Sequence, residues 1–201
     1  MRKVAIALFV AVGVLGVGAI ATAHDGDGSS SNGGRLNGYQ EVSSISTTGF
    51  GSFHLKINQG GESVDYTLSY RNLESAVTQA HIHFAQRSVS GPIAVWLCDG
   101  DPLAGPQPPA GVATPPVCPP ASGGTVSGTF RPTDLIATGR GLGPGTVPGE
   151  WEELLAAIKV GHTYANVHTV NWGPGEIRGQ ISDRDQKEYT GPPLFAMEDD
   201  E

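Results

Sequence analysis

The sequence predicts an all-β fold, an antiparallel β-sandwich or flattened Greek-key barrel with one amphipathic helix. Three observations support this prediction. Apolar and polar residues alternate with period two in several short segments, turns rich in glycine and proline separate these segments, and only one segment has the apolar spacing of a helix. The 29 glycines and 15 prolines in 201 residues fit a chain of short strands and many turns.

The first 23 residues have the pattern of a secretory signal peptide. Arg2 and Lys3 form a basic start, residues 4–20 are an uncharged apolar run, and Ala21-Thr22-Ala23 is a small-residue cleavage site. An uncleaved anchor is the alternative, because the run approaches membrane-spanning length. We expect cleavage, and therefore a secreted or extracytoplasmic protein, periplasmic or extracellular, without a membrane span.

The chain that remains after cleavage is acidic. Without Arg2 and Lys3, 10 basic residues face 20 acidic ones, a formal charge of -10. This charge argues against nucleic acids and anionic membrane surfaces as partners and weakly favours cations. The length suits one domain, which we place at residues 35–182, between a disordered leader at 24–34 and an acidic disordered tail at 183–201.

Both cysteines, Cys98 and Cys118, follow the signal peptide. An even cysteine count in an exported chain predicts one disulfide. This bond would close a segment, residues 98–124, in which proline and glycine are too frequent for regular structure.

The strands follow from the alternation. Phe53, Leu55 and Ile57 alternate with polar residues, among them His54, which is expected to be solvated. After a turn at 59–62, a second alternation runs from Val64 to Tyr70. The two segments therefore predict a β-hairpin. Further strands are expected at residues 77–84, 93–97, 125–130, 164–169 and 176–181.

One helix is expected around residues 150–159. Trp151, Leu154, Leu155 and Ile158 have the spacing of one buried helix face, acidic residues stand at the start, and Gly161 follows as the stop.

Histidines on two expected strands form the candidate site. His81 and His83 lie on one face of their strand because side chains alternate, and Asn166 and His168 share a face in the same way. If the two strands meet, His81, His83 and His168 could bind copper or zinc, with water, His162 or a carboxylate such as Glu176 as the fourth ligand.

The alternative is a structural network. Buried histidines are often hydrogen-bonded to backbone carbonyls, and a set of His, Asn and Thr side chains would then only specify the strand pairing. Glu176 and Arg178 are expected to form an internal ion pair on one face of the last strand, completed by Glu41. Trp172 is either an exposed contact residue or a lid over the histidines.

Five motifs occur together along the chain. They are Leu36-x-Gly38-x-Gln40-Glu41-Val42, Ala80-His81-Ile82-His83, Gly91-Pro92, the segment 164–169 and the segment 174–181. In combination they resemble the CHRD domain, the module first named from chordin, in a single-domain secreted form of the bacterial style. This resemblance covers about residues 35 to 182 and implies an extracellular all-β module; it does not imply an enzyme activity. In chordin such modules sit among repeats that act in growth-factor binding, and this chain has one such module and no cysteine-rich repeats.

The His81-x-His83 pair is also similar to the His-x-His of copper/zinc superoxide dismutases. Dismutation would need a bridging histidine and a second metal cluster, and none is evident in the loop. We therefore expect a non-catalytic module that binds a metal or an unknown protein. A matrix-associated interaction module with structural histidines is the alternative, and a dismutase-like metalloenzyme comes third.

Overall fold

A computed structural model describes residues 30–100 and 107–181 of the chain. These residues form eight strands, one α-helix and three short 3-10 helices. The strands are β1 (Ser30–Asn37), β2 (Phe50–Ile57), β3 (Val64–Arg71), β4 (Val77–Phe84), β5 (Ile93–Asp99), β6 (Gly123–Phe130), β7 (Thr163–Thr169) and β8 (Ile177–Ile181). The helices are α1 (Glu150–Lys159), η1 (Gly38–Gln40), η2 (Gln59–Gly61) and η3 (Pro132–Asp134).

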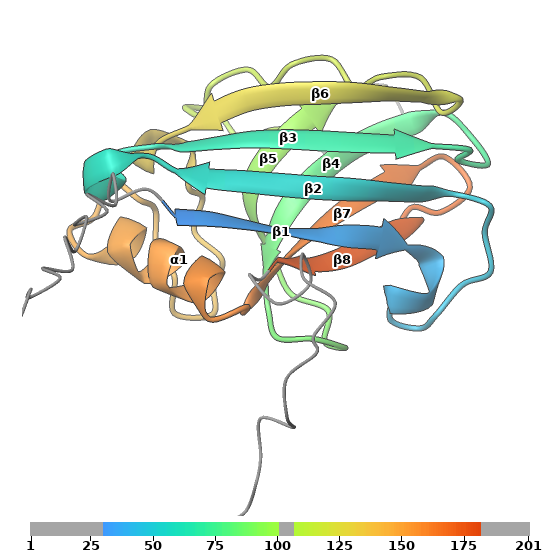
Figure 1. Cartoon of the computed structure of the whole chain (residues 1–201). Coiled ribbons are helices and arrows are strands. Elements are labelled where there is room, and N and C mark those ends of the chain that lie inside the picture. Colours follow the sequence, from blue (N-terminus) through green and yellow to red (C-terminus); the bar gives the residue numbers. More distant parts are fainter. Residues whose placement is uncertain (1–29, 101–106, 182–201) are drawn as a thin grey trace, which may run out of the picture.

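All eight strands belong to one sheet with the order β5-β4-β7-β8-β1-β2-β3-β6. Every pairing between these strands is antiparallel. Figure 1 shows the sheet folded into two layers, with β1, β2, β3 and β6 in front and β4, β5, β7 and β8 behind. The end strands β5 and β6 approach each other, so the barrel is nearly closed and the predicted fold class is confirmed.

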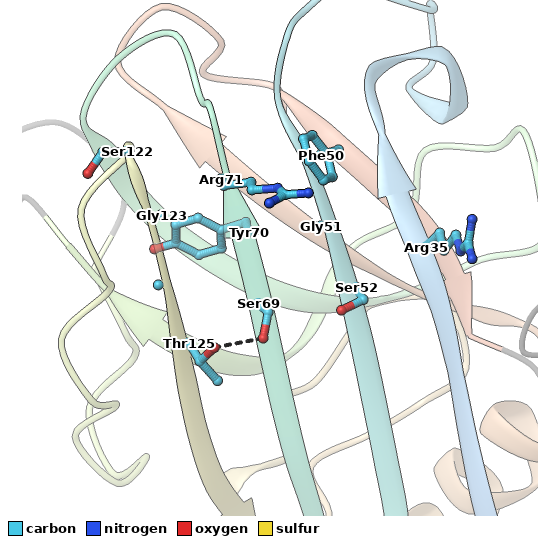
Figure 2. A pocket seen from close by; sticks show the side chains of 11 residues that line it. Arg35, Phe50, Gly51, Ser52, Ser69, Tyr70, Arg71, Ser122, Gly123 and Thr125 are labelled. Carbon is cyan, nitrogen blue, oxygen red and sulfur yellow. Dashed lines mark hydrogen bonds between the residues drawn. The ribbon is translucent and has the colours of Figure 1, made fainter.

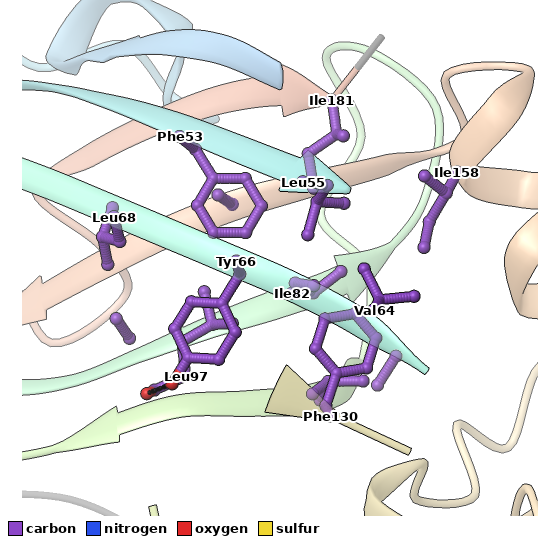
Figure 3. Close-up of a cluster of buried hydrophobic side chains, with 14 of the residues drawn as sticks. Phe53, Leu55, Val64, Tyr66, Leu68, Ile82, Leu97, Phe130, Ile158 and Ile181 are labelled. Carbon is purple, nitrogen blue, oxygen red and sulfur yellow. Dashed lines mark hydrogen bonds between the residues drawn. The ribbon is translucent and has the colours of Figure 1, made fainter. Parts of the chain in front are cut away.

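The front layer has the expected two-sided pattern. In β2 and β3, alternate residues are buried and the residues between them are partly or fully exposed. The buried set packs against Ile82 and Leu97 of the back layer, as Figure 3 shows. Burial of these apolar side chains is the main favourable term in folding. The residues labelled in that core are Phe53, Leu55, Val64, Tyr66, Leu68, Ile82, Leu97, Phe130, Ile158 and Ile181.

The back layer is buried on both faces. Every residue of β7 and β8 is buried, and in β4 only the last residue is partly exposed. One face of these strands packs into the core, and the other carries polar and aromatic side chains. Polar groups that lose contact with water must find partners inside the protein, and this requirement shapes the candidate site.

Helix α1 closes one end of the barrel, beside the turn between β2 and β3 (Figure 1). It buries the expected apolar face, and the Trp151 indole N–H donates to the carbonyl of Gly61 in that turn. Acidic residues in the first turn and Lys159 in the last match the helix dipole.

The disulfide between Cys98 and Cys118 is formed, with a Cα–Cα distance of 5.0 Å. It ties the end of β5 to the proline-rich segment, where Asp99 also bridges to Val117. The backbone N–H of Asp99 donates to Pro116, and that of Cys118 donates to Asp99. The cross-link therefore anchors a segment that has few other backbone hydrogen bonds to the sheet.

One boundary prediction is wrong. Residues 30–34 were expected to belong to a disordered leader because they are rich in glycine and serine, but β1 begins at Ser30 and pairs with β2 along its whole length. The predicted signal peptide, residues 24–29 and the acidic tail lie outside the described residues. None of the helices in the described part has both the length and the apolar character that a membrane crossing requires.

Reduction of the disulfide should lower the free energy of unfolding by about 3 kcal/mol, because the closed loop restricts the unfolded chain. Urea unfolding with and without a phosphine reductant measures this difference. The double variant Cys98→Ala, Cys118→Ala is the control, since its unfolding should not respond to the reductant. Equal stability of the oxidised and reduced wild-type protein would contradict the prediction.

Candidate metal centre

Pairing between β4 and β7 brings the three predicted histidines together. His81 lies opposite Asn166, His83 lies opposite Tyr164, and Gln79 lies opposite His168. Side chains at paired positions point to the same face of a sheet, so all three imidazoles lie on the outward face of the back layer. The predicted sharing of faces is confirmed, and the two strands meet.

The three rings are close and buried. One ring nitrogen from each histidine lies within 4.8 Å of one from each of the other two. His81 is 0% exposed, His83 7% and His168 6%. Within the described residues this is the one group of three or more His, Cys, Asp or Glu side chains that could hold a metal ion.

Backbone carbonyls fix two of the three tautomers. Nδ1–H of His83 donates to the carbonyl of Gly91 at 2.9 Å, and Nδ1–H of His168 donates to Gly173 at 2.8 Å. Nε2 therefore carries the lone pair in both rings. In metalloproteins the ligand histidines commonly donate their other N–H to a carbonyl in this way, which fixes tautomer and orientation.

His81 completes the cluster. Its Nδ1 lies 3.2 Å from Nε2 of His168, and since that nitrogen carries a lone pair, His81 is the donor in the metal-free protein. Nε2 of His81 and Nε2 of His83 are buried and have no hydrogen-bond partner. Unpaired buried polar atoms are rare in folded proteins and call for an explanation.

Burial keeps the cluster neutral. Desolvation lowers the pKa of His81 well below its usual value, helped by the nearby His168 and His83. The pKa of His83 is lowered to about 3 and that of His168 to about 4, in both cases mainly by burial. The neutral imidazole is the form that binds metals.

Aromatic rings surround the imidazoles. Tyr164 stacks on His83 with a centroid distance of 4.7 Å and an interplanar angle of 3°. The guanidinium of Arg178 lies 3.4 Å from the centroid of the Tyr164 ring, a cation–π contact. Trp96 packs edge-on against His81 at 4.2 Å. These contacts hold the rings and exclude water from them.

Asn166 and Glu41 form a second polar layer. The Asn166 amide donates to Glu41 Oε1 at 2.6 Å and to the Ile177 carbonyl at 3.1 Å. Burial raises the pKa of Glu41 to about 7, although the Asn166 hydrogen bond and the charge of Arg178 oppose this rise. Gly175 allows this approach, because a Cβ there would lie 2.5 Å from Asn166 Oδ1 and its φ is +136°.

The predicted ion pair between Glu176 and Arg178 is wrong. Glu176 precedes β8, so strand alternation does not apply to it. Its buried carboxylate accepts hydrogen bonds from Thr47 Oγ1 at 2.7 Å, Thr169 Oγ1 at 2.8 Å and the backbone N–H of Glu74 at 2.9 Å. Glu176 thus joins three segments of the chain and is not in the histidine group.

The remaining candidates do not belong to the histidine group. His162 is exposed and lines a separate hollow with Arg140, and His54 is exposed on the front layer. The Trp172 indole donates to Glu74 at 2.9 Å.

Two residues that contact the histidines, Tyr164 and Trp96, were not predicted from the sequence. Tyr164 could have been found, because it lies two residues before Asn166 and shares its face, whereas no periodic signal marks Trp96 in an apolar strand.

Burial of three neutral imidazoles predicts that the metal-free protein loses stability as the pH falls below about 6.5. Above this value the histidines are neutral in both states. Below it the unfolded chain binds three protons that the folded cluster excludes, down to pH values of about 3 to 4. Folded Glu41 takes up one proton between about pH 4.5 and 7 and partly opposes the loss. The net two protons correspond to roughly 2–3 kcal/mol per pH unit between about 4.5 and 6.5.

Urea unfolding of chelator-treated protein at pH 5, 6 and 7 measures this slope. The variant His162→Asn, which changes an exposed histidine, should keep the wild-type slope, and His83→Asn should reduce it. A free energy of unfolding that does not change with pH between 5 and 6.5 would show that the histidines titrate in the fold as they do in the unfolded chain.

The comparison with protein-family models gives one match, the CHRD domain, over residues 34–181. No curated protein and no solved structure matches the chain. The matched residues begin within β1, end with the last residue of β8 and include all three clustered histidines. They cover well over half of the chain, and the family resemblance expected from the sequence motifs is confirmed: the chain belongs to the CHRD domain family.

Proposed function

We propose that this CHRD domain protein is a non-catalytic binding module that holds one transition-metal ion with His81, His83 and His168. The observation that carries the proposal is the orientation of the rings. Hydrogen bonds to Gly91 and Gly173 occupy the Nδ1 atoms of His83 and His168, which leaves the lone pair of each ring on Nε2, where it can bind a metal.

The spacing of the donors supports the same proposal. Two imidazole nitrogens bound to one tetrahedral ion at about 2.0–2.1 Å are about 3.3 Å apart. His81 Nδ1 and His168 Nε2 are 3.2 Å apart without an ion. Binding of an ion between these two atoms would require the His81 proton to move from Nδ1 to Nε2, so that Nδ1 becomes the donor and the ring stays neutral. His83 Nε2 would be the third donor, since one ring nitrogen of each histidine lies within 4.8 Å of one from each of the other two.

The charge and burial of the cluster favour copper(I) among the copper and zinc ions. Three neutral ligands leave the charge of the ion uncompensated, and a buried divalent ion costs more than a monovalent one. Zinc usually completes its shell with a fourth ligand, often water. Exposed fractions of 0%, 7% and 6% leave little access for water.

The same closure supports a role in binding and not in catalysis. A metalloenzyme needs an open coordination position that substrate can reach. The described residues also offer no second metal group of the kind that a copper/zinc dismutase uses. The disulfide points to an oxidising compartment, which fits a secreted or extracytoplasmic protein.

A second candidate is an extracellular interaction module in which the histidines are purely structural. The hydrogen bond between His81 and His168 favours it, since the pair is satisfied without a metal. In that case the buried Nε2 of His83 would remain unpaired, at a cost of about 1–3 kcal/mol, whereas a bound metal would use it. Because this cost is avoidable, we rank the structural candidate second.

Metal binding predicts a rise in melting temperature when copper(I), copper(II) or zinc(II) is added to chelated protein. A ligand at a hundredfold excess over its Kd stabilises the folded state by about 2.7 kcal/mol, which corresponds to several degrees. Copper(I), kept reduced under anaerobic conditions, should give the largest rise. Calorimetry measures the transition, and elemental analysis after dialysis measures the bound metal.

Two variants separate a metal site from a structural network. An Asn side chain can keep the hydrogen bond that Nδ1 of histidine makes but has no group at the position of Nε2. His83→Asn should therefore fold and lose the metal-induced shift, and His162→Asn should retain it. If none of the three ions raises the melting temperature, or if His83→Asn retains the rise, the histidines have a purely structural role.

A further inference from the structure

The outward face of the front layer carries an open groove at the end where β2 starts and β3 ends (Figure 2). Its volume is about 610 Å³. Four strands contribute to it, and it lies on the other layer from the histidine cluster. The residues that line it and bear on the argument are Arg35, Phe50, Ser52, Ser69, Arg71 and Thr125.

Two arginines give the groove its charge. Arg35 on β1 and Arg71 on β3 are both exposed, and the lining contains no acidic residue. Within the described residues neither guanidinium is paired with a carboxylate. The nearest acidic residue along the chain, Glu74, accepts a hydrogen bond from Trp172. In a chain with a net charge of -8, two unpaired arginines in one groove form a local site for anions.

The aromatic ring of Phe50 lies between the two arginines in Figure 2. It is 38% exposed, and the guanidinium of Arg71 stacks on it with its central carbon 4.3 Å from the ring centroid. Stacking of this kind holds the flat guanidinium in place while its N–H groups stay available to a carboxylate or sulfate. The rest of the ring offers an apolar surface beside the charge.

Hydroxyl groups form the floor. Strand register places Arg35, Ser52, Ser69 and Thr125 in one row across four strands. Ser69 and Thr125 are linked by a hydrogen bond of 2.8 Å, and Ser52 is exposed. Each hydroxyl can donate and accept, as the hydroxyls of a sugar do. The floor therefore matches a hydroxyl-rich ligand better than an apolar one.

The spacing of the charges points to an extended ligand. Arg35 and Arg71 are two strands and two residues apart, about 12 Å between Cα atoms. Arg71 is held on the Phe50 ring, and Figure 2 shows Arg35 on the other side of that ring, so a chain with repeated acidic groups fits both arginines. An acidic peptide is expected at a free sheet edge, where it can add a strand, and this groove crosses the face of the sheet.

We infer that this groove binds an acidic polysaccharide, with Arg35 and Arg71 holding its carboxylate or sulfate groups and Phe50 packing against a sugar ring. This site is independent of the histidine cluster and of the proposed metal. It gives the module a second ligand, of the class that an extracytoplasmic protein meets in cell envelopes and matrices.

Affinity electrophoresis of the full chain in gels with four embedded polymers tests the inference. The probes are polygalacturonate, which carries carboxylates, dextran sulfate, which carries sulfates, neutral dextran, and polyglutamate as an acidic peptide. At one ionic strength the protein should be retarded by polygalacturonate, dextran sulfate or both, and retardation by only one of them identifies the anionic group. Dextran should not retard it, and polyglutamate should retard it more weakly.

The double variant Arg35→Gln, Arg71→Gln should weaken polysaccharide binding by about tenfold or more. It should keep the wild-type melting temperature, since both side chains are exposed. The variant Arg140→Gln, Lys159→Gln removes two exposed charges outside the groove and should bind as wild type. Phe50→Ala should weaken polysaccharide binding more than it weakens any retardation by polyglutamate, because the ring both packs against the sugar and holds Arg71.

Three results would overturn the inference. The first is no retardation by either acidic polysaccharide. The second is equal loss of binding in the two charge-matched double variants, which would mean attraction by overall charge. The third is retardation by polyglutamate at least as strong as by the polysaccharides, which would mean that an acidic peptide is the better ligand.

Discussion

The antiparallel pairing of β4 with β7 is the constraint on which the rest of the structure depends. Both strands lie in a layer that is buried on its two faces, so the polar side chains of the outward face cannot rely on water. The register then decides which polar groups meet. His81 faces Asn166 and His83 faces Tyr164, and each of these contacts depends on residues more than 80 positions apart in the chain.

Most of this buried polar face is satisfied internally. Backbone carbonyls at Gly91 and Gly173 accept from the Nδ1–H groups of two histidines, and the Asn166 amide donates to Glu41 and to the Ile177 carbonyl. Among the described residues, the side-chain atoms that remain unpaired include Nε2 of His83, which is a donor in the proposed metal site. A network built only for stability would gain by pairing it, whereas a ligand site keeps a donor free.

The two layers of the barrel differ in their outward faces. The back layer is closed and its outward face holds neutral imidazoles, which suits an ion that needs few ligands and no water. The front layer is open to solvent, with two arginines that no carboxylate of residues 30–100 or 107–181 pairs with, beside a row of hydroxyls. The hydrophobic core lies between the two outward faces. Changes on the exposed front face should therefore leave the histidine geometry intact.

The sequence by itself determined seven of the eight described strands, the helix, the disulfide and the sharing of a face by His81 and His83. These features depend on local periodicity or on composition, which neighbouring residues reveal. Composition failed at residues 30–34, because β1 is held by backbone hydrogen bonds to β2, and glycine and serine can make these as other residues do.

Only the tertiary structure decided that His168 joins the other two histidines, that Trp96 covers His81, and that Glu176 turns away from Arg178. Each of these outcomes depends on strand order or on the path of a turn. Contacts between distant segments are set by how the whole chain packs, and no local pattern records that packing.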